Sequence, residues 1–227
     1  MSFSLETAVP WGRSYDEYVA MFSLTETDLD KRILGCGDGP ASFNAELTKR
    51  GGKVVSVDPV YQFVAKDIKS RIDATYDEVM AQTRKNRNEF VWRHIKTIEA
   101  LGSIRMEAMA RFLEDYPDGD GRYVAGGLPS LPFADKEFNL ALCSHFLFLY
   151  SEQFSSEFHL QSIRELCRVA AEVKIFPLLE LGSRKSRYLD KVIAMLDKEE
   201  WNWCIEEVHY EFQKGGNEVL HIEPSNQ

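Results

Sequence analysis

Three glycines in a G-x-G-x-G spacing, set between a strand-like and a helix-like segment, constrain the fold of this chain more than any other feature. They are Gly35, Gly37 and Gly39. Residues 32–34 read as the end of a strand, residues 42–50 have helical composition, and residues 53–57 alternate as a second strand does. Glycine is needed where a strand turns sharply into a helix beside a bound ligand, because a side chain would occupy the ligand's place. The stretch therefore predicts half of a nucleotide-binding α/β fold.

An acid at the end of the second predicted strand narrows the class of ligand that the fold could bind. Asp58 lies about 20 residues beyond the glycines, where a carboxylate can accept hydrogen bonds from the two hydroxyls of a ribose. A dinucleotide fingerprint, G-x-G-x-x-G, would place its third glycine at position 40, which is occupied by Pro40. The spacing therefore disfavours a nicotinamide oxidoreductase.

Composition limits the size of the fold and the kind of partner. With 227 residues and 44% apolar content, the chain can bury one sizeable core, so we expect a single domain over residues 1–227. The formal net charge of -9 argues against a broad nucleic-acid-binding face, because such faces depend on clustered Lys and Arg.

The cysteines point to a reducing compartment, and the hydropathy pattern bears on membrane and secretory segments. The cysteines, none of them in a C-x-x-C pair, are Cys36, Cys143, Cys167 and Cys204. They fall in patterns typical of buried strands and helices, so we expect reduced core thiols and a cytoplasmic protein. No apolar run reaches about 18 residues, and the first ten residues lack a charged start followed by a hydrophobic block. We therefore expect no membrane span and no secretory signal.

A long helical insertion follows the second strand. Residues 61–117 contain few glycines and little strand pattern, whereas a simple doubly wound unit needs one helix there. Extra length at the carboxyl ends of strands is where α/β sheets build substrate pockets, so we assign the insertion to substrate recognition or to a lid. Its candidate contacts are Tyr76, Arg84, Arg87, Trp92, Arg93 and His94. For each of these, a solvated helical face is the alternative.

The second half of the chain continues the strand and helix alternation. Residues 122–125, 138–143 and 171–177 are predicted strands, and residues 156–169, capped by Ser155 or Ser156, and 186–200 are predicted helices. Residues 205–212 and 218–222 then read as two strands joined by a turn at residues 213–217. Because hairpin strands run antiparallel, the sheet should end on a reversed strand.

Two stretches, in the right order, resemble class I S-adenosylmethionine (SAM) dependent methyltransferases. Leu34 to Gly39 reads LGCGDG, and residues 131–142 read LPFADKEFNLAL, close to the first and a later motif of that family. The resemblance implies a doubly wound α/β fold with a mostly parallel seven-stranded sheet, a reversed last strand and, here, a helical insertion between the second and third strands. The terminal hairpin expected above agrees with this layout.

The resemblance also implies a site. SAM would be held by Gly35, Cys36, Gly37, Gly39, Asp58, Pro59, Val60, Gly127, Leu128 and Ser144. Candidate general bases are His145, Tyr150 and Glu152, with His145 the best placed. In this family a leading segment, here residues 1–30, often covers the cofactor, which would put Trp11, Arg13, Tyr15 or Tyr18 at the rim. Simple docking of that helix to the core is the alternative.

The chain departs from the family pattern at two positions. An acid usually stands two residues before the first glycine and another before the amide that contacts adenine, but these positions hold Ile33 and Gly127. Asp38 or Asp16 could replace the first. Each lost charged hydrogen bond would weaken binding by about 1.5–3 kcal/mol if nothing replaced it.

Taken together, the motifs predict a SAM-dependent methyltransferase acting on a small molecule. The rival hypotheses are an RNA or protein methyltransferase, which needs the insertion's basic residues on one face, and a non-catalytic module that binds SAM or its product. We expect no metal, because His159, His209 and His221 show no H-x-x-x-H spacing.

Overall fold

A seven-stranded sheet forms the centre of the computed structural model, which describes residues 9–224. Its strand order is β3-β2-β1-β4-β5-β9-β8. The strands are β1 (Arg32–Cys36), β2 (Lys53–Val57), β3 (Tyr123–Val124), β4 (Phe138–Ser144), β5 (Ala170–Phe176), β8 (Asn202–Glu207) and β9 (Glu218–Glu223). Strands β1 to β5 pair in parallel, whereas β9 is antiparallel to both β5 and β8. The mostly parallel sheet with a reversed last strand is thereby confirmed.

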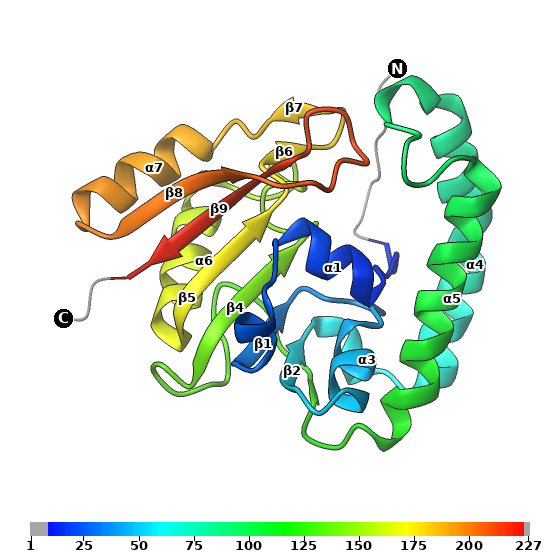
Figure 1. The fold of residues 1–227 in the computed structure, drawn as a ribbon, viewed down its shortest axis with the longest axis horizontal. Helices are drawn as coiled ribbons and strands as arrows, with labels where there is room; N and C mark the ends of the chain where they lie inside the picture. The colour runs from blue at the N-terminus through cyan, green and yellow to red at the C-terminus, as the bar shows by residue number, and fades with distance from the viewer. Residues whose placement is uncertain (1–8, 225–227) are drawn as a thin grey trace.

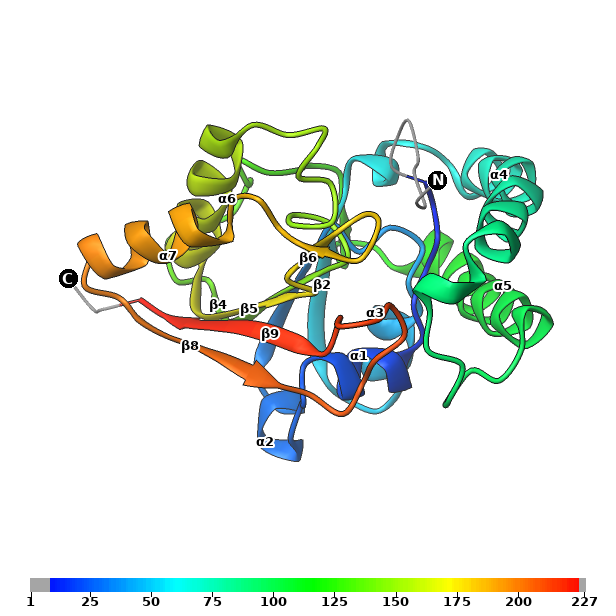
Figure 2. The same ribbon diagram turned by 90° about the horizontal axis from the view of Figure 1, so that it is seen from above.

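Helices cover both faces of the sheet (Figures 1 and 2). One face carries α1 (Tyr15–Met21), α2 (Glu26–Leu29) and α3 (Phe43–Lys49), and the other carries α6 (Ser156–Val169) and α7 (Leu189–Lys198). Successive strand residues point to opposite faces, so Ile33 joins the apolar cluster with α1 and α3 while Leu34 joins the cluster with α6 and α7. This two-sided burial explains why the strands read as continuous apolar runs.

The insertion consists of two long helices beside the sheet edge. They are α4 (Ala65–Lys85) and α5 (Ile98–Asp115), with short 3-10 turns η1 (Pro59–Gln62), η2 (Arg87–Glu89) and η3 (Tyr116–Asp118) around them. Ile68 and Ile72 of α4 pack with Met109 and Phe112 of α5 in a third apolar cluster. The predicted helical insertion is confirmed. Within the part of the chain that the structure describes, no helix is both long and apolar enough to span a bilayer.

A buried ion network joins three segments that are distant in sequence. Glu17 of α1 receives both terminal nitrogens of Arg105 in α5, with Nη2 2.7 Å from Oε1. Tyr210, in the loop after β8, donates its hydroxyl to the same Oε1 at 2.7 Å, and the Ser14 backbone donates to Oε2 at 3.0 Å. The Arg105 side chain is fully buried. One carboxylate thus fastens the first helix, the insertion and the loop of the terminal hairpin together.

The terminal hairpin differs from the sequence prediction. Strand β8 begins at Asn202 and ends at Glu207, so the predicted strand over residues 205–212 is wrong in its second half. Val208, Tyr210 and Phe212 alternate as strand residues do, but their side chains are buried in the cluster around α1. The alternation therefore reflects a loop, residues 208–217, that packs onto the core.

Smaller differences lie nearby. Helix α7 starts at Leu189, three residues after the expected start at 186, because a two-stranded hairpin, β6 (Leu179–Glu180) with β7 (Arg184–Lys185), occupies the preceding segment. Cys204 is exposed on β8, so the expectation of buried thiols is wrong for this residue and right for the other three. The leading segment expected over residues 1–30 begins outside the described residues, which start at Val9.

Replacing Arg105 with Ala should lower the free energy of unfolding by about 3–5 kcal/mol, because the buried Glu17 carboxylate loses its charged partner. Urea denaturation measures this change. The matched control is Arg111→Ala on the same helix, whose 46% exposed side chain pairs with Glu46 and Glu107 at the surface. That variant should lose at most about 1 kcal/mol, and equal losses in both variants would contradict a structural role for the buried network.

Candidate functional site

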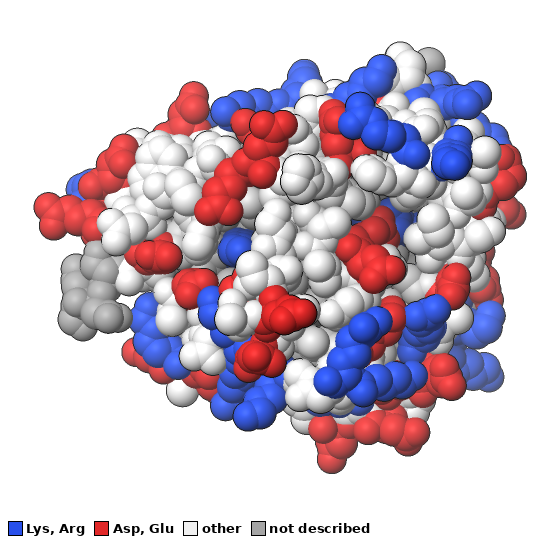
Figure 3. All heavy atoms as spheres, in the orientation of Figure 1, with Lys and Arg blue, Asp and Glu red and all other residues white. Residues whose placement is uncertain are grey.

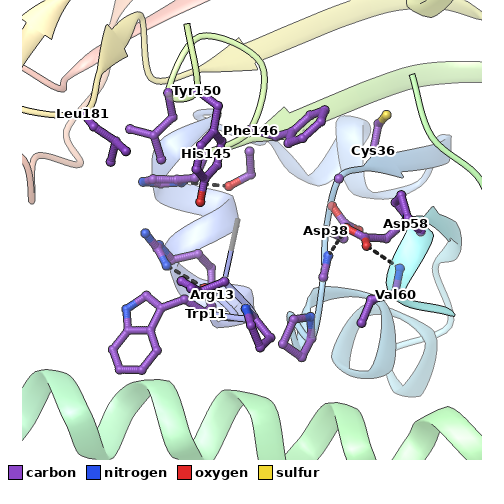
Figure 4. A pocket seen from close by; sticks show the side chains of 18 of the residues that line it. Trp11, Arg13, Cys36, Asp38, Asp58, Val60, His145, Phe146, Tyr150 and Leu181 are labelled. Carbon is purple, nitrogen blue, oxygen red and sulfur yellow. Dashed lines mark hydrogen bonds between the residues drawn. The ribbon is translucent and has the colours of Figure 1, made fainter. Parts of the chain in front are cut away.

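A cavity of about 590 Å³ opens at the carboxyl ends of β1, β2 and β4. From β1 the sheet extends to one side through β2 and β3, and the chain then crosses over to extend it on the other side, beginning with β4. Such a topological switch point, here between β1 and β4, leaves a crevice at the carboxyl ends of the strands. Figure 4 shows the residues that point into it. Of the sequence-predicted site residues, the cavity is lined by Cys36, Gly37, Gly39, Asp58, Pro59, Val60, Gly127, Leu128, Ser144, His145 and Tyr150.

The glycines of the loop after β1 have different tasks. Gly35 does not line the cavity; a Cβ there would lie 1.8 Å from Oδ2 of Asp38, so glycine lets that carboxylate fold back under the loop. Gly37 has φ +71°, and a Cβ on it would be 3.0 Å from the ring of Phe146. Gly39 has φ +51°. The loop thus keeps its backbone bare where a ligand would cross it.

Asp58 ties the glycine loop to the segment after β2. Its Oδ2 accepts from the backbone of Gly39 at 2.9 Å, and its Oδ1 accepts from the backbone of Val60 at 2.8 Å (Figure 4). Burial raises the pKa of this carboxyl, while the two backbone donors oppose the rise. Each carboxylate oxygen keeps a second lone pair, so the group can still accept from a ligand in the cavity.

The chain has Ile33 where the family usually carries an acid, but Asp38 provides a buried carboxyl group at the cavity. Ile33 is fully buried in the core, whereas Asp38 lines the cavity and accepts from the hydroxyls of Tyr18 at 2.7 Å and Ser56 at 2.6 Å. Burial raises the pKa of Asp38 to about 6, and the nearby Asp58 adds to the rise. The other substitute considered from the sequence, Asp16, is exposed. A cationic group entering here would favour the ionised carboxylate.

The missing acid at position 127 has a steric reason. A Cβ on Gly127 would lie 3.1 Å from Cγ of Pro59, so a side chain at this position would displace the proline ring. Gly127 and Leu128 together with Pro59 and Val60 form a mostly apolar end of the cavity. This end suits a flat heterocycle held by contact and backbone groups.

Ser144, the last residue of β4, and His145, which follows it, stand at the opposite end. His145 has φ +51°, an uncommon backbone conformation for a residue with a Cβ, held by its N–H donating to the carbonyl of Phe176 at 2.7 Å. Its Nδ1 lies 2.9 Å from the Ser144 hydroxyl. Burial and the charges of Arg13 and Arg105 hold the pKa of His145 well below its usual value. The imidazole is therefore neutral at pH 7 and a weak base.

The two other candidate bases, Tyr150 and Glu152, differ in their position relative to the cavity. Tyr150 lines the cavity and is buried, and that burial raises its pKa, so its hydroxyl stays protonated at neutral pH. Glu152 is exposed and lies outside the cavity lining found for the described residues.

Arg13 brings a cation to the same end of the cavity. Its Nη1 donates to the carbonyl of Trp11 at 2.7 Å, and its Nε is buried without a hydrogen-bond partner among the described residues. Burial, with the charge of Arg105, lowers its pKa to about 10, so it remains charged at pH 7. Because Glu17 is taken up by Arg105, Arg13 has no carboxylate of its own within residues 9–224. A buried cation of this kind calls for an anionic ligand group.

The leading segment and the insertion contribute differently from the sequence expectation. Trp11, Arg13 and Tyr18 line the cavity, but Tyr15 stacks on Phe43 and serves to dock α1. The insertion lines the cavity through residues that the sequence analysis did not select: Gln62, Phe63, Arg71, Val79, Thr83, Glu89, Phe90 and Leu101. Among described residues, none of the six candidates chosen from the insertion lines this cavity, and Arg93 and His94 line a smaller one of about 140 Å³.

The sheet order, the reversed β9, the glycine loop and Asp58 define a class I methyltransferase fold. The chain belongs to the same family as the uncharacterized protein MJ0045 of Methanocaldococcus jannaschii, with 36% identity over 220 residues, covering 96% of this chain and 97% of that protein. No family model matches the chain.

Solved structures with a similar fold are distant in sequence. A SAM-bound magnesium protoporphyrin IX methyltransferase (ChlM) from Synechocystis PCC 6803 is 12% identical, with a TM-score of 0.48, covering 93% of this chain and 78% of that one. The PH0226 protein from Pyrococcus horikoshii OT3 is 13% identical, with a TM-score of 0.49 and coverages of 93% and 91%.

The raised pKa of Asp38 should make stability fall as the pH rises. Folding favours the protonated carboxyl, so this group's contribution is fully present below the unfolded pKa near 4 and is lost as the pH passes 6. The loss should total roughly 3 kcal/mol between pH 3 and 7. The difference in unfolding free energy between wild type and Asp38→Asn, measured by urea denaturation across this range, isolates the effect. A difference that does not change with pH would contradict it.

Proposed function

We propose that this protein is a SAM-dependent methyltransferase. The observation that carries the proposal is one cavity that joins the glycine loop, the acid Asp58, the buried acid Asp38 and a half-buried cation, Arg13, whose Nε is buried and unpartnered among the described residues. SAM carries a ribose, an ammonium group and a carboxylate, for which Asp58, Asp38 and Arg13 respectively are suitable partners. The unpartnered Nε of Arg13 and the open space beside Gly39, where a Cβ would meet only Asp58 at 4.0 Å, fit such a ligand.

Each part of the cofactor has a proposed partner. The ribose hydroxyls bind Asp58, and the adenine lies between Pro59, Val60, Gly127 and Leu128. The methionine ammonium binds Asp38, replacing the acid that the family carries at the position of Ile33. Its carboxylate binds Arg13, and Gly37 with Ser144 borders the chain between them.

The chemistry asked of the protein is mainly positional. SAM supplies an electrophilic methyl group on a sulfonium, and the protein holds the acceptor in line with it and excludes water. His145 lies at that end of the cavity as a neutral imidazole, positioned by Ser144 and Phe176. Because Arg13 and Arg105 disfavour its protonated form, His145 serves better as a hydrogen-bonding group than as a strong base. Tyr150 offers a second hydroxyl there.

We further propose a small-molecule acceptor, with residues 61–117 and 1–30 forming its enclosure. Aromatic and aliphatic side chains border the cavity beyond the proposed cofactor site, among them Phe90, Leu149, Phe154, Leu181 and Phe212. On the face in Figure 3, Lys and Arg occur in small groups interspersed with Asp and Glu, which offers little support for a nucleic-acid partner. The free thiols support a reducing, cytoplasmic setting.

A module that binds SAM or its product without turnover is the second hypothesis. The lowered pKa of His145 favours it, because the residue best placed to act as a general base is then a weak one. Acceptors that need no deprotonation remain compatible with catalysis. Binding of SAM's product without methyl transfer to any acceptor would select this hypothesis.

Isothermal titration of the full chain with SAM, S-adenosylhomocysteine and NADH tests the cofactor. We expect saturable binding of the first two and none of NADH. Asp58→Ala should weaken S-adenosylhomocysteine binding at least about tenfold, because bonds to a charged acceptor contribute about 1.5–3 kcal/mol. Asp67→Ala, an exposed acid on α4, is the control and should bind as wild type does. Unchanged affinity in Asp58→Ala, or binding of NADH alone, would refute the assignment.

Arg13→Gln should separate the two ends of the cofactor. We expect S-adenosylhomocysteine affinity to fall about tenfold or more, because its carboxylate loses a charge-assisted bond. The affinity for 5′-methylthioadenosine, which lacks the amino-acid portion, should stay as in wild type. An equal loss for both ligands would mean that Arg13 shapes the cavity without contacting the carboxylate.

A further inference from the structure

Three metal-ligating side chains converge on the terminal hairpin, on the face of the sheet opposite α7. Cys204 and Glu206 are two apart in β8 and so project from the same face. His221 of β9 stands directly opposite Cys204 in the strand register. Figure 2 shows α7 over one face of β8 and β9. The cluster is separate from the cavity described above.

The ligand atoms already have the spacing of a coordination shell. Cys204 Sγ lies 3.3 Å from Oε1 of Glu206, and Nδ1 of His221 lies 3.2 Å from the same oxygen. In tetrahedral zinc sites with bonds of about 2.0–2.3 Å, neighbouring ligand atoms are roughly 3.3–3.6 Å apart. A cation could enter with small side-chain adjustments.

The second nitrogen of His221 gives an independent indication. Nε2 is buried and has no hydrogen-bond partner among the described residues. Two carboxylates stand near it, Glu172 at 3.8 Å and Glu223 at 3.9 Å. A metal-bound histidine usually gives its other N–H to a carboxylate, which fixes the ring and strengthens the ligand. Glu172, which accepts from Lys31 Nζ at 2.9 and 3.0 Å, would come within hydrogen-bond range of Nε2 after a small rotation of the ring.

The geometry points to a zinc-type divalent cation site formed by Cys204, Glu206 and His221, with the fourth position open to water. Thiolate, imidazole and carboxylate are ligands that Zn²⁺ accepts together. The neighbouring cation, Lys174, donates to the Phe22 carbonyl at 3.1 Å and lies 3.9 Å from Asp28, so its charge is engaged elsewhere. Binding releases the Cys204 thiol proton to solvent and joins β8 to β9, whose connecting loop borders the cavity through Phe212.

Cobalt titration of the untagged, chelator-treated full chain tests the site. We expect binding of one Co²⁺ with a thiolate-to-cobalt absorption band, which Cys204→Ser abolishes; the other three cysteines are buried. His221→Gln and Glu206→Gln should each weaken binding about tenfold or more, and Glu172→Gln, which removes an orienting group, by about tenfold. Glu207→Gln is the matched control, on the same strand but the opposite face.

Two results would overturn the inference. One is the absence of a thiolate band in wild type, and the other is equal cobalt affinity in Glu206→Gln and Glu207→Gln, which would mean nonspecific binding to surface carboxylates. Binding of S-adenosylhomocysteine, measured on the same samples, reports on the proposed function separately, because these residues lie outside its cavity.

Discussion

The carboxylate of Glu17 is the interaction on which the cavity depends. It accepts hydrogen bonds from Arg105 of the insertion, from Tyr210 in the loop after β8 and from the backbone of Ser14 at the start of α1. Three segments that border the cavity, from different parts of the chain, therefore meet at one buried group. A buried charge deprived of its partner is strongly destabilising, which sets these walls in one arrangement. Because this single acid balances one arginine, the charge of Arg13 remains available to the cavity.

Sequence alone was sufficient where the signal is local. The glycine loop and the helix capped by Ser155 each depend on residues within a few positions of one another, and Asp58 ends the strand that follows the loop; the structure has them where they were expected. Helix α6 was predicted with its observed bounds because an N-cap serine and an amphipathic repeat coincide. The mostly parallel sheet with a reversed last strand followed from the family layout and from the hairpin signal at the end of the sequence, whereas the order of the strands comes from the structure.

Prediction from the sequence failed where tertiary contacts determine the local structure. Val208, Tyr210 and Phe212 alternate like a strand because every second side chain enters the core around α1, a fact the sequence does not contain. In the insertion, charged and aromatic residues were selected for their chemistry, yet Phe90 and Leu101 line the cavity, and both pack in the apolar cluster around α1. The Cys204 and His221 pairing requires the register between two strands.

The contact between Gly35 and Asp38 changes how such a protein should be searched for in sequence collections. A Cβ at position 35 would lie 1.8 Å from the Asp38 carboxylate, so the inward position of this acid requires glycine at position 35. The family pattern expects the acid ahead of the glycine, in the strand, where this chain has Ile33 in the core. A search profile that rewards G-x-x-D as one unit, in place of an acid two residues before the first glycine, would retrieve chains that carry the carboxylate on the loop.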